Sequence, residues 1–231
     1  MFQFKQFSIT QKQTTMKVNT DGVLLGAWAN VGEAKTVLDI GTGTGVIALM
    51  LAQKNANAKI DAIEIDEKAS EEARENAEKS PFFARILVFN SALQNFVSET
   101  KYDVIISNPP YFVDDLKPEN QNKLGAKHAV SLSYEELIFH AEKLLSENGK
   151  IIVEVPIFNA GLLQECAQMS KLLLTEICHV KARTDKPFYL ALLGFERTEK
   201  LLHETEITIQ NPDNSFTKEY VELTKGFYLK M

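Results

Sequence analysis

The residues best suited to chemistry follow an apolar run as "SNPPY" (Ser107–Tyr111). The Asn108 side chain and the Pro109 carbonyl offer two hydrogen-bond acceptors, and Tyr111 offers a flat face on which an unstacked base can lie. Such a set suits a planar amine, because two acceptors aimed at its hydrogens would hold a nitrogen whose lone pair is delocalised. Pro109 and Pro110 fix φ and carry no competing N–H. The alternative is a turn that merely ends a strand.

A glycine-rich loop, "DIGTGTG" (Asp39–Gly45), is the second candidate site. A dinucleotide-binding loop starting at Gly41 would need its last glycine one place after Gly45, where this chain has Val46. The Gly-Lys-Ser/Thr ending of a phosphate-binding P-loop is also missing. With Gly41, Gly43 and Gly45, the backbone can approach a ligand closely without a pyrophosphate to bind.

Glu64 ends the next strand-like segment, 23 residues after Gly41. At this spacing a carboxylate can accept hydrogen bonds from both hydroxyls of a ribose. S-adenosylmethionine fits the combination, because it has a ribose, no phosphate, and two positive groups that Asp39 and Glu64 would favour. The loop and Glu64 therefore predict S-adenosylmethionine as the cofactor; the alternative is a surface glutamate beside an ordinary strand-to-helix turn.

Both candidate sites depend on an alternation of strands and helices. The predicted strands are Thr36–Ile40, Ala58–Asp66, Ala84–Asn90, Lys101–Ser107 and Lys150–Pro156. The predicted helices are Gly45–Asn55, Glu67–Ser80, Ser133–Gly149 and Ala160–Ser170. Strands separated by helices predict an α/β fold with a parallel sheet covered on both faces. Parallel strands end at the same edge, so the glycine loop and the SNPPY segment should meet there.

The end of the chain has a different pattern. Leu172–Ala182 and Pro187–Arg197 are predicted to form an antiparallel hairpin, and Phe216–Leu229 a final helix. No internal repeat or linker is apparent, so residues 1–231 are predicted to form a single domain. Within it, residues 1–35 would form an N-terminal flap and helix, and residues 36–231 the catalytic core.

Composition narrows the range of partners. A net charge of −6 argues against indiscriminate binding of nucleic acid but leaves room for a local basic face. One candidate for that face is the group Lys181, Arg183 and Lys186 near the tail hairpin, and another is the loop around His128. The alternative for each candidate is a set of ordinary solvated charges. The Ala- and Glu-rich run Glu67–Ser80 predicts a helix with a solvated face.

No apolar stretch in the chain approaches the length of a membrane span, and the N-terminus lacks a signal-peptide pattern. We therefore expect a cytoplasmic protein without a membrane partner. No His, Cys or Asp cluster has metal-ligand spacing, so no metal site is predicted. Nothing in the sequence points to a protein partner.

The order of "DIGTGTG", "AIEID" and "SNPPY" resembles the class I, Rossmann-like S-adenosylmethionine methyltransferases that modify amino nitrogens. More closely, "FKQFSI", "MKVNTDGVLLGAWA", "IISNPPY" and the C-terminal "FYL" resemble the bacterial tRNA1(Val) adenine-37 N6-methyltransferase family, nearly end to end. The resemblance implies a mostly parallel sheet of seven strands with an antiparallel last strand. It also implies methylation of the adenine just 3′ of a valine tRNA anticodon.

The resemblance further implies roles for individual residues. Gly41, Gly43 and Gly45 would form the cofactor loop, Glu64 would bind the ribose, and Asn108–Tyr111 would bind the target amine. The segment Lys17–Gly22, including Lys17 and Thr20, would cover the methionine end of the cofactor. Many relatives have an aspartate that contacts the cofactor adenine where this chain has Ala92. Ser91 or backbone groups would have to replace that contact.

Other functions share these motifs. An enzyme could methylate a guanine amine in ribosomal RNA or a glutamine amide in a protein, although the glutamine enzymes resemble longer chains with an N-terminal helical domain. A DNA methyltransferase would need a separate recognition domain, and none is visible. The third possibility is a non-catalytic module that binds cofactor or RNA. The presence of Asn108 argues against it.

Overall fold

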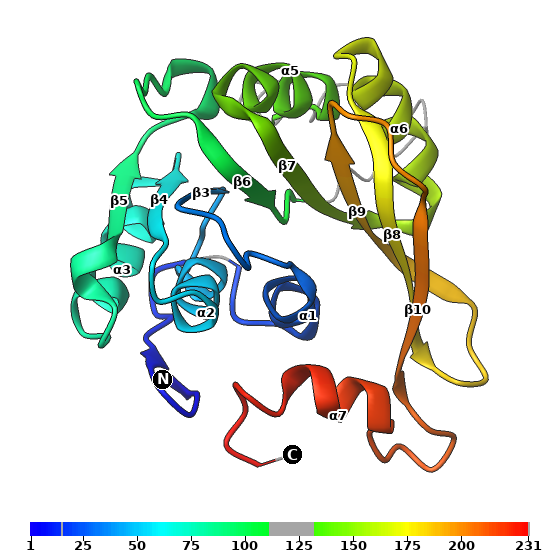
Figure 1. Cartoon of the computed structure of the whole chain (residues 1–231). Coiled ribbons are helices and arrows are strands. Elements are labelled where there is room, and N and C mark those ends of the chain that lie inside the picture. Colours follow the sequence, from blue (N-terminus) through cyan, green and yellow to red (C-terminus); the bar gives the residue numbers. More distant parts are fainter. Residues whose placement is uncertain (15, 111–131, 231) are drawn as a thin grey trace, which may run out of the picture.

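The computed structural model of the chain describes residues 1–14, 16–110 and 132–230. An eight-stranded sheet with the order β10-β8-β9-β7-β6-β3-β4-β5 forms its centre (Figure 1). In chain order the strands are β3 (Thr36–Ile40), β4 (Lys59–Glu64), β5 (Ile86–Asn90), β6 (Tyr102–Ser107), β7 (Leu145–Pro156), β8 (Leu173–Arg183), β9 (Phe188–Glu196) and β10 (His203–Gln210). Only β9 is antiparallel to its neighbours in this sheet; the other pairs are parallel. The α/β fold class, the parallel arrangement and the hairpin of β8 and β9 are confirmed.

The sheet has eight strands rather than the seven expected, because β10 adds to the edge beside β8. Of its residues only Ile209 is buried, so the segment lacks the apolar run that marks the inner strands. Its charged side chains, such as Glu204 and Glu206, are typical of a protected sheet edge. The weak apolar pattern explains why the sequence alone did not predict this strand.

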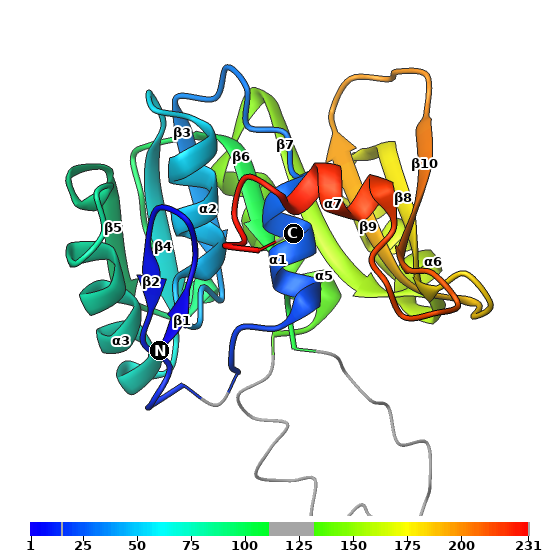
Figure 2. The same cartoon turned by 90° about the horizontal axis from the view of Figure 1, so that it is seen from below.

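Helices cover both faces of the sheet (Figures 1 and 2). The longer helices are α1 (Thr20–Trp28), α2 (Val46–Lys54), α3 (Glu67–Glu78), α5 (Tyr134–Leu144), α6 (Ala160–Met169) and α7 (Lys218–Thr224). One hydrophobic core lies between the sheet and α1, α2 and α7, and a second core lies between the opposite face and α5 and α6. Within the described ranges, no helix combines the length and the apolar character needed to cross a bilayer.

The two ends of the chain pack together. The short strands β1 (Phe2–Gln3) and β2 (Ser8–Ile9) form an antiparallel hairpin. Phe4, at the start of its turn, is fully buried, and its ring centroid lies 4.6 Å from that of Phe7 and 5.9 Å from that of Tyr228. The predicted final helix is shorter than expected, since α7 ends at Thr224.

The boundary between α5 and β7 was wrongly predicted. A capping box of Ser133 and Glu136 begins the helix where it was predicted to begin, but the helix ends at Leu144, not at Gly149. Gly149 lies in β7, where an added Cβ would lie 2.8 Å from the carbonyl oxygen of Tyr102 in the neighbouring strand β6. This glycine permits close contact between two strands and does not stop a helix.

Gly149→Ala is expected to lower the free energy of unfolding by about 2 kcal/mol, because the methyl group would force two packed strands apart. Gly161→Ala is the matched control. Gly161 lies in α6 with no atom within 4 Å of an added Cβ, so alanine there should raise the free energy of unfolding by about 0.5–1 kcal/mol. Urea unfolding of both variants measures the difference, and equal effects would contradict the strand assignment of Gly149.

Candidate active site

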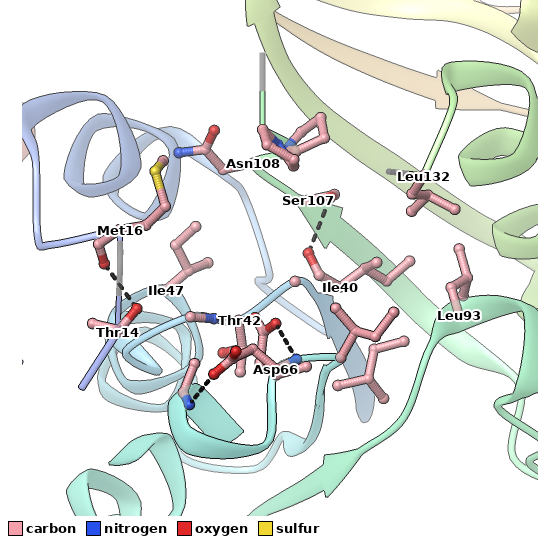
Figure 3. Close-up of a pocket in the computed structure, with 18 of the residues that line it drawn as sticks. Thr14, Met16, Ile40, Thr42, Ile47, Asp66, Leu93, Ser107, Asn108 and Leu132 are labelled. Atoms are coloured by element: carbon pink, nitrogen blue, oxygen red, sulfur yellow. Dashed lines mark hydrogen bonds between the residues drawn. The ribbon is translucent and has the colours of Figure 1, made fainter. Parts of the chain in front are cut away.

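The candidate site lies at the carboxyl ends of β3, β4, β5 and β6, which the parallel register brings to one edge. Ile40 pairs with Ile63 in β4 and with Ser107 in β6, so the segments that follow these strands emerge side by side. The Ser107 hydroxyl also donates a 3.0 Å hydrogen bond to the carbonyl of Ile40. A cavity of about 630 Å³ opens between these segments (Figure 3). The predicted meeting of the glycine loop with the SNPPY segment is confirmed for residues 107–110.

The glycine loop lines the floor of this cavity with Gly41 and Gly43. Gly41, Gly43 and Gly45 have φ values of +70°, +55° and +80°, in the left-handed region that side chains disfavour. The amides of Gly41 and Thr42 donate to the carbonyl of Ile63, which fastens the loop to the end of β4. Nothing lies within 4 Å of a Cβ built on Gly41 or Gly43, so a ligand can approach the backbone there.

Glu64 lies on the cavity wall beside the loop. One carboxylate oxygen accepts a 2.9 Å hydrogen bond from the amide of Gly43, and the other accepts a 3.0 Å bond from the amide of Asp66. Each oxygen keeps a further lone pair, because a carboxylate oxygen can accept two hydrogen bonds. The carboxylate is therefore held in one orientation and can still bind two hydroxyl groups.

Asp39 lies beneath the loop and is not among the cavity-lining residues. It is fully buried, and one of its oxygens accepts a 2.6 Å hydrogen bond from the Thr42 hydroxyl. Burial, with a smaller contribution from the charge of Glu64, raises the pKa of Asp39 to about 7. The geometry makes Asp39 a support of the loop, and its direct contact with a cofactor stays a prediction.

The N-terminal segment forms the opposite wall. Thr14, Met16, Lys17, Val18, Asn19 and Gly22 line the cavity. Lys17 was predicted there from the sequence, whereas Thr20, the first residue of α1, lies outside the lining set. The Asn19 side chain caps α1 by accepting a 2.9 Å hydrogen bond from the amide of Gly22.

Asn108, Pro109 and Pro110 line the cavity, and Tyr111 lies outside the described residues. The Asn108 side chain extends from the end of β6 toward Met16 (Figure 3). An added Cβ on Gly22 would lie 3.5 Å from Nδ2 of Asn108, so the amide packs beside the first turn of α1. The target-amine candidates and the N-terminal segment thus share one cavity.

The remaining wall surrounds Ser91 and Ala92, which also line the cavity. Ile65, Leu93 and Leu132 supply apolar side chains to this end of the cavity. Gln94, Asn95 and Glu136 add polar side chains that the sequence reasoning missed. Glu136 lies in the first turn of the predicted helix, but only the fold brings this helix end to the cavity.

The predicted basic residues of the tail hairpin lie at the carboxyl end of β8, outside the cavity. Arg183 is paired with Asp185 at 2.6 Å, and the Lys181 ammonium lies 4.2 Å from the centroid of the Phe188 ring. The second candidate, around His128, lies outside the described residues. In the described ranges, no group of three or more His, Cys, Asp or Glu residues is arranged to hold a metal ion.

Comparison with solved structures shows the same architecture. A predicted O-methyltransferase from Agrobacterium tumefaciens has a TM-score of 0.67 at 17% identity, over 90% of this chain and 96% of that one. An O-methyltransferase of a trans-AT PKS multienzyme from Brevibacillus brevis, in complex with S-adenosyl-L-homocysteine, has a TM-score of 0.53 at 14% identity, over 75% and 70% of the two chains. At such identities the likeness concerns the fold, which is that of class I methyltransferases.

The sequence comparisons go further. Residues 20–158 match the family model of the methyltransferase small domain, and proteins of this family and fold in general use S-adenosylmethionine. The chain is 44% identical over 233 residues to the tRNA1(Val) (adenine(37)-N6)-methyltransferase of Dyadobacter fermentans, covering 99% of this chain and 97% of the relative. It is 42% identical over 234 residues to the protein of that name from Flavobacterium psychrophilum, covering 100% of both. With such identity over the full length of both proteins, this chain is a methyltransferase that belongs to the tRNA1(Val) (adenine(37)-N6)-methyltransferase family.

Proposed function

We propose that this chain transfers the methyl group of S-adenosylmethionine to the N6 amine of an adenine in tRNA, at position 37 of tRNA1(Val). One observation carries the proposal: Asn108 and Pro109 line the same cavity as the glycine loop and Glu64. An acceptor pair for an amine and a carboxylate suited to a ribose thus lie around one space. The relatives' name supplies the choice of adenine and tRNA.

The residues that line the cavity support its use as the cofactor site. Glu64 would accept hydrogen bonds from the two ribose hydroxyls, and the backbone at Gly41 and Gly43 would approach the ligand closely. The N-terminal segment, with Lys17, would enclose the methionine end, and Thr20 would support this segment from the start of α1. The purine ring would lie between Ile65 and the apolar residues that follow β5, with the polar groups of Ser91, Gln94 and Glu136 near its edge. The bound cofactor supplies an electrophilic methyl group on a positively charged sulfur.

The target amine would donate its two hydrogens to the Asn108 side-chain oxygen and the Pro109 carbonyl. These acceptors orient the nitrogen toward the methyl donor and favour the tetrahedral geometry that develops during transfer. No general base is needed beforehand, because the amine can release its extra proton after the transfer. Tyr111 would supply the surface on which the adenine ring stacks.

We further propose that Lys181, Arg183 and Lys186 contact RNA phosphates. The carboxyl end of β8 lies at the same sheet edge as that of β6, since β8 runs parallel to it through β7 and β9. With a tRNA substrate the protein would act in the cytoplasm, and residues 1–231 would act as a single domain without DNA or a protein partner.

The test is incubation of the purified chain with labelled S-adenosylmethionine and bulk tRNA from a strain that lacks the enzyme. We expect label only as N6-methyladenosine, and ribonuclease mapping should locate it at position 37 of tRNA1(Val). Ribosomal RNA and total protein serve as parallel substrates. Label in either of these, with none in tRNA, would refute the proposal.

Asn108→Ala should lower kcat by about 100-fold or more, because it removes one of two acceptors that orient the reacting amine. The Kd for S-adenosylmethionine, measured by calorimetry, should change less than about threefold, since the cofactor's ribose and loop contacts are untouched. Circular dichroism controls for folding. Turnover like that of the wild type would remove Asn108 from the proposed site.

Asp39→Asn should change how stability depends on pH. Burial raises the pKa of Asp39 from an ordinary 3.8 to about 7, so the folded state prefers the protonated carboxyl. The contribution of Asp39 to the free energy of unfolding is therefore fully present below pH 3.8 and is lost as the pH rises through 7. Asparagine stays neutral at every pH. The free energy of unfolding of the variant should therefore rise relative to that of the wild type by about 2 kcal/mol or more between pH 4 and pH 8. Thermal unfolding across this range measures the gain, and a constant difference would contradict it.

A further inference from the structure

Helix α3, which the sequence predicted to present a solvated face, carries three buried polar side chains, those of Ser70, Glu72 and Asn76. Glu72 and Asn76 are only 3% and 2% exposed, although the neighbouring Glu71 and Glu75 face solvent. A buried carboxylate is costly unless hydrogen bonds satisfy it. The partners of these two residues therefore indicate what the helix face does.

Glu72 binds consecutive backbone amides of the N-terminal segment. One oxygen accepts from the amide of Lys12 at 2.5 Å and from that of Gln13 at 3.3 Å. The other accepts from the amide of Gln13 at 3.2 Å and from that of Thr14 at 3.0 Å. Successive amides that point at one carboxylate hold this stretch of backbone in a single curved conformation.

Asn76, one turn further along α3, joins the same segment to the glycine loop. Its Oδ1 accepts a 2.8 Å hydrogen bond from the amide of Thr10, and its Nδ2 donates to the carbonyl of Thr10 at 2.9 Å. Nδ2 also donates at 2.9 Å to the carbonyl of Thr44, directly before Gly45. One side chain thus contacts both the N-terminal segment and the loop on the cavity floor.

The anchored residues lead directly into the cavity wall. Thr14, the last amide bound by Glu72, lines the cavity, as do Met16, Lys17 and Val18. The Gln11 side chain accepts a 2.9 Å hydrogen bond from the amide of Val18, which ties the wall back to the anchored stretch. The position of this wall therefore depends on Glu72, Asn76 and Gln11.

We infer that Glu72 and Asn76 are positioning residues that hold the N-terminal segment in its cofactor-binding arrangement, so that they set cofactor affinity and leave methyl transfer to other groups. The inference rests on the proposed binding of S-adenosylmethionine in this cavity. A pre-ordered wall binds a ligand without the entropic cost of ordering the chain at that moment. Loss of the anchor should weaken cofactor binding while the bound complex reacts at its normal rate.

Glu72→Gln tests this directly, because glutamine keeps the shape but has only one acceptor oxygen and turns an N–H₂ group toward backbone donors. We expect the Kd for S-adenosylmethionine to rise about tenfold by calorimetry, equivalent to about 1.4 kcal/mol. The kcat at saturating cofactor and the KM for tRNA should stay within about twofold of the wild type. Glu71→Gln, an exposed neighbour with the same change of charge, should leave all three values unchanged.

Hydrogen exchange supplies a readout that does not depend on activity. Without ligand, the amides of residues 12–14 should exchange faster in Glu72→Gln than in the wild type or in Glu71→Gln. Gln11→Ala is a second variant, at a half-buried residue that belongs to neither hydrophobic core. It should also raise the cofactor Kd, by about threefold, with kcat unchanged.

The outcomes separate this inference from the proposed function. If the wild type does not bind S-adenosylmethionine, the proposed function fails, whatever the exchange data show. If the wild type binds it, but Glu72→Gln and Gln11→Ala bind equally well, the positioning role is wrong and the proposed function stands. A loss of kcat at saturating cofactor with an unchanged Kd would likewise overturn the positioning role.

Discussion

The site depends on the hydrogen bonds that hold the carboxylate of Glu64. Glu64 ends β4, yet its two oxygens accept from Gly43 in the loop after β3 and from Asp66 at the start of α3. One side chain therefore joins the loop after β3, the end of β4 and the start of α3 at the edge of the sheet. The bond to Gly43 requires the left-handed backbone of the loop, which glycine adopts without strain. The position of the carboxylate and the shape of the loop depend on each other.

Helix α3 extends this arrangement to the far wall of the cavity. Its first turn begins at the Asp66 cap, beside Glu64, and its buried face reaches the N-terminal segment through Glu72 and Asn76. The segment stays close because the hairpin before it is packed into the core by Phe4, against Tyr228 from the other end of the chain. Residues more than 200 positions apart thus stabilise one wall of the site.

Sequence reasoning succeeded where local pattern and tertiary environment agree. The limits of β3 match the prediction, because a short, mostly apolar segment of this kind is typical of a strand buried inside a parallel sheet. The cap at Ser133 follows from side-chain chemistry within one helical turn. Sequence reasoning failed where contacts between distant residues determine the structure. The segment of β10 is too polar to be predicted as a strand. Gly149 allows β6 and β7 to approach closely, and the residues around it in the sequence do not indicate this contact.

The sequence by itself determined the alternation of strands and helices and the glycine loop, and it singled out Glu64, Asn108 and Pro109 as the candidates for binding a ribose and an amine. These features follow from the order of residue types along short stretches, where backbone preference and hydrogen-bond chemistry act locally. Only the tertiary structure decided that Asp39 lies beneath the loop, that Glu136 reaches the cavity, and that Glu72 is an anchor and not a solvated charge. The physical reason is burial: whether a polar side chain meets solvent, a ligand or a backbone amide depends on elements that pack against it from elsewhere in the chain.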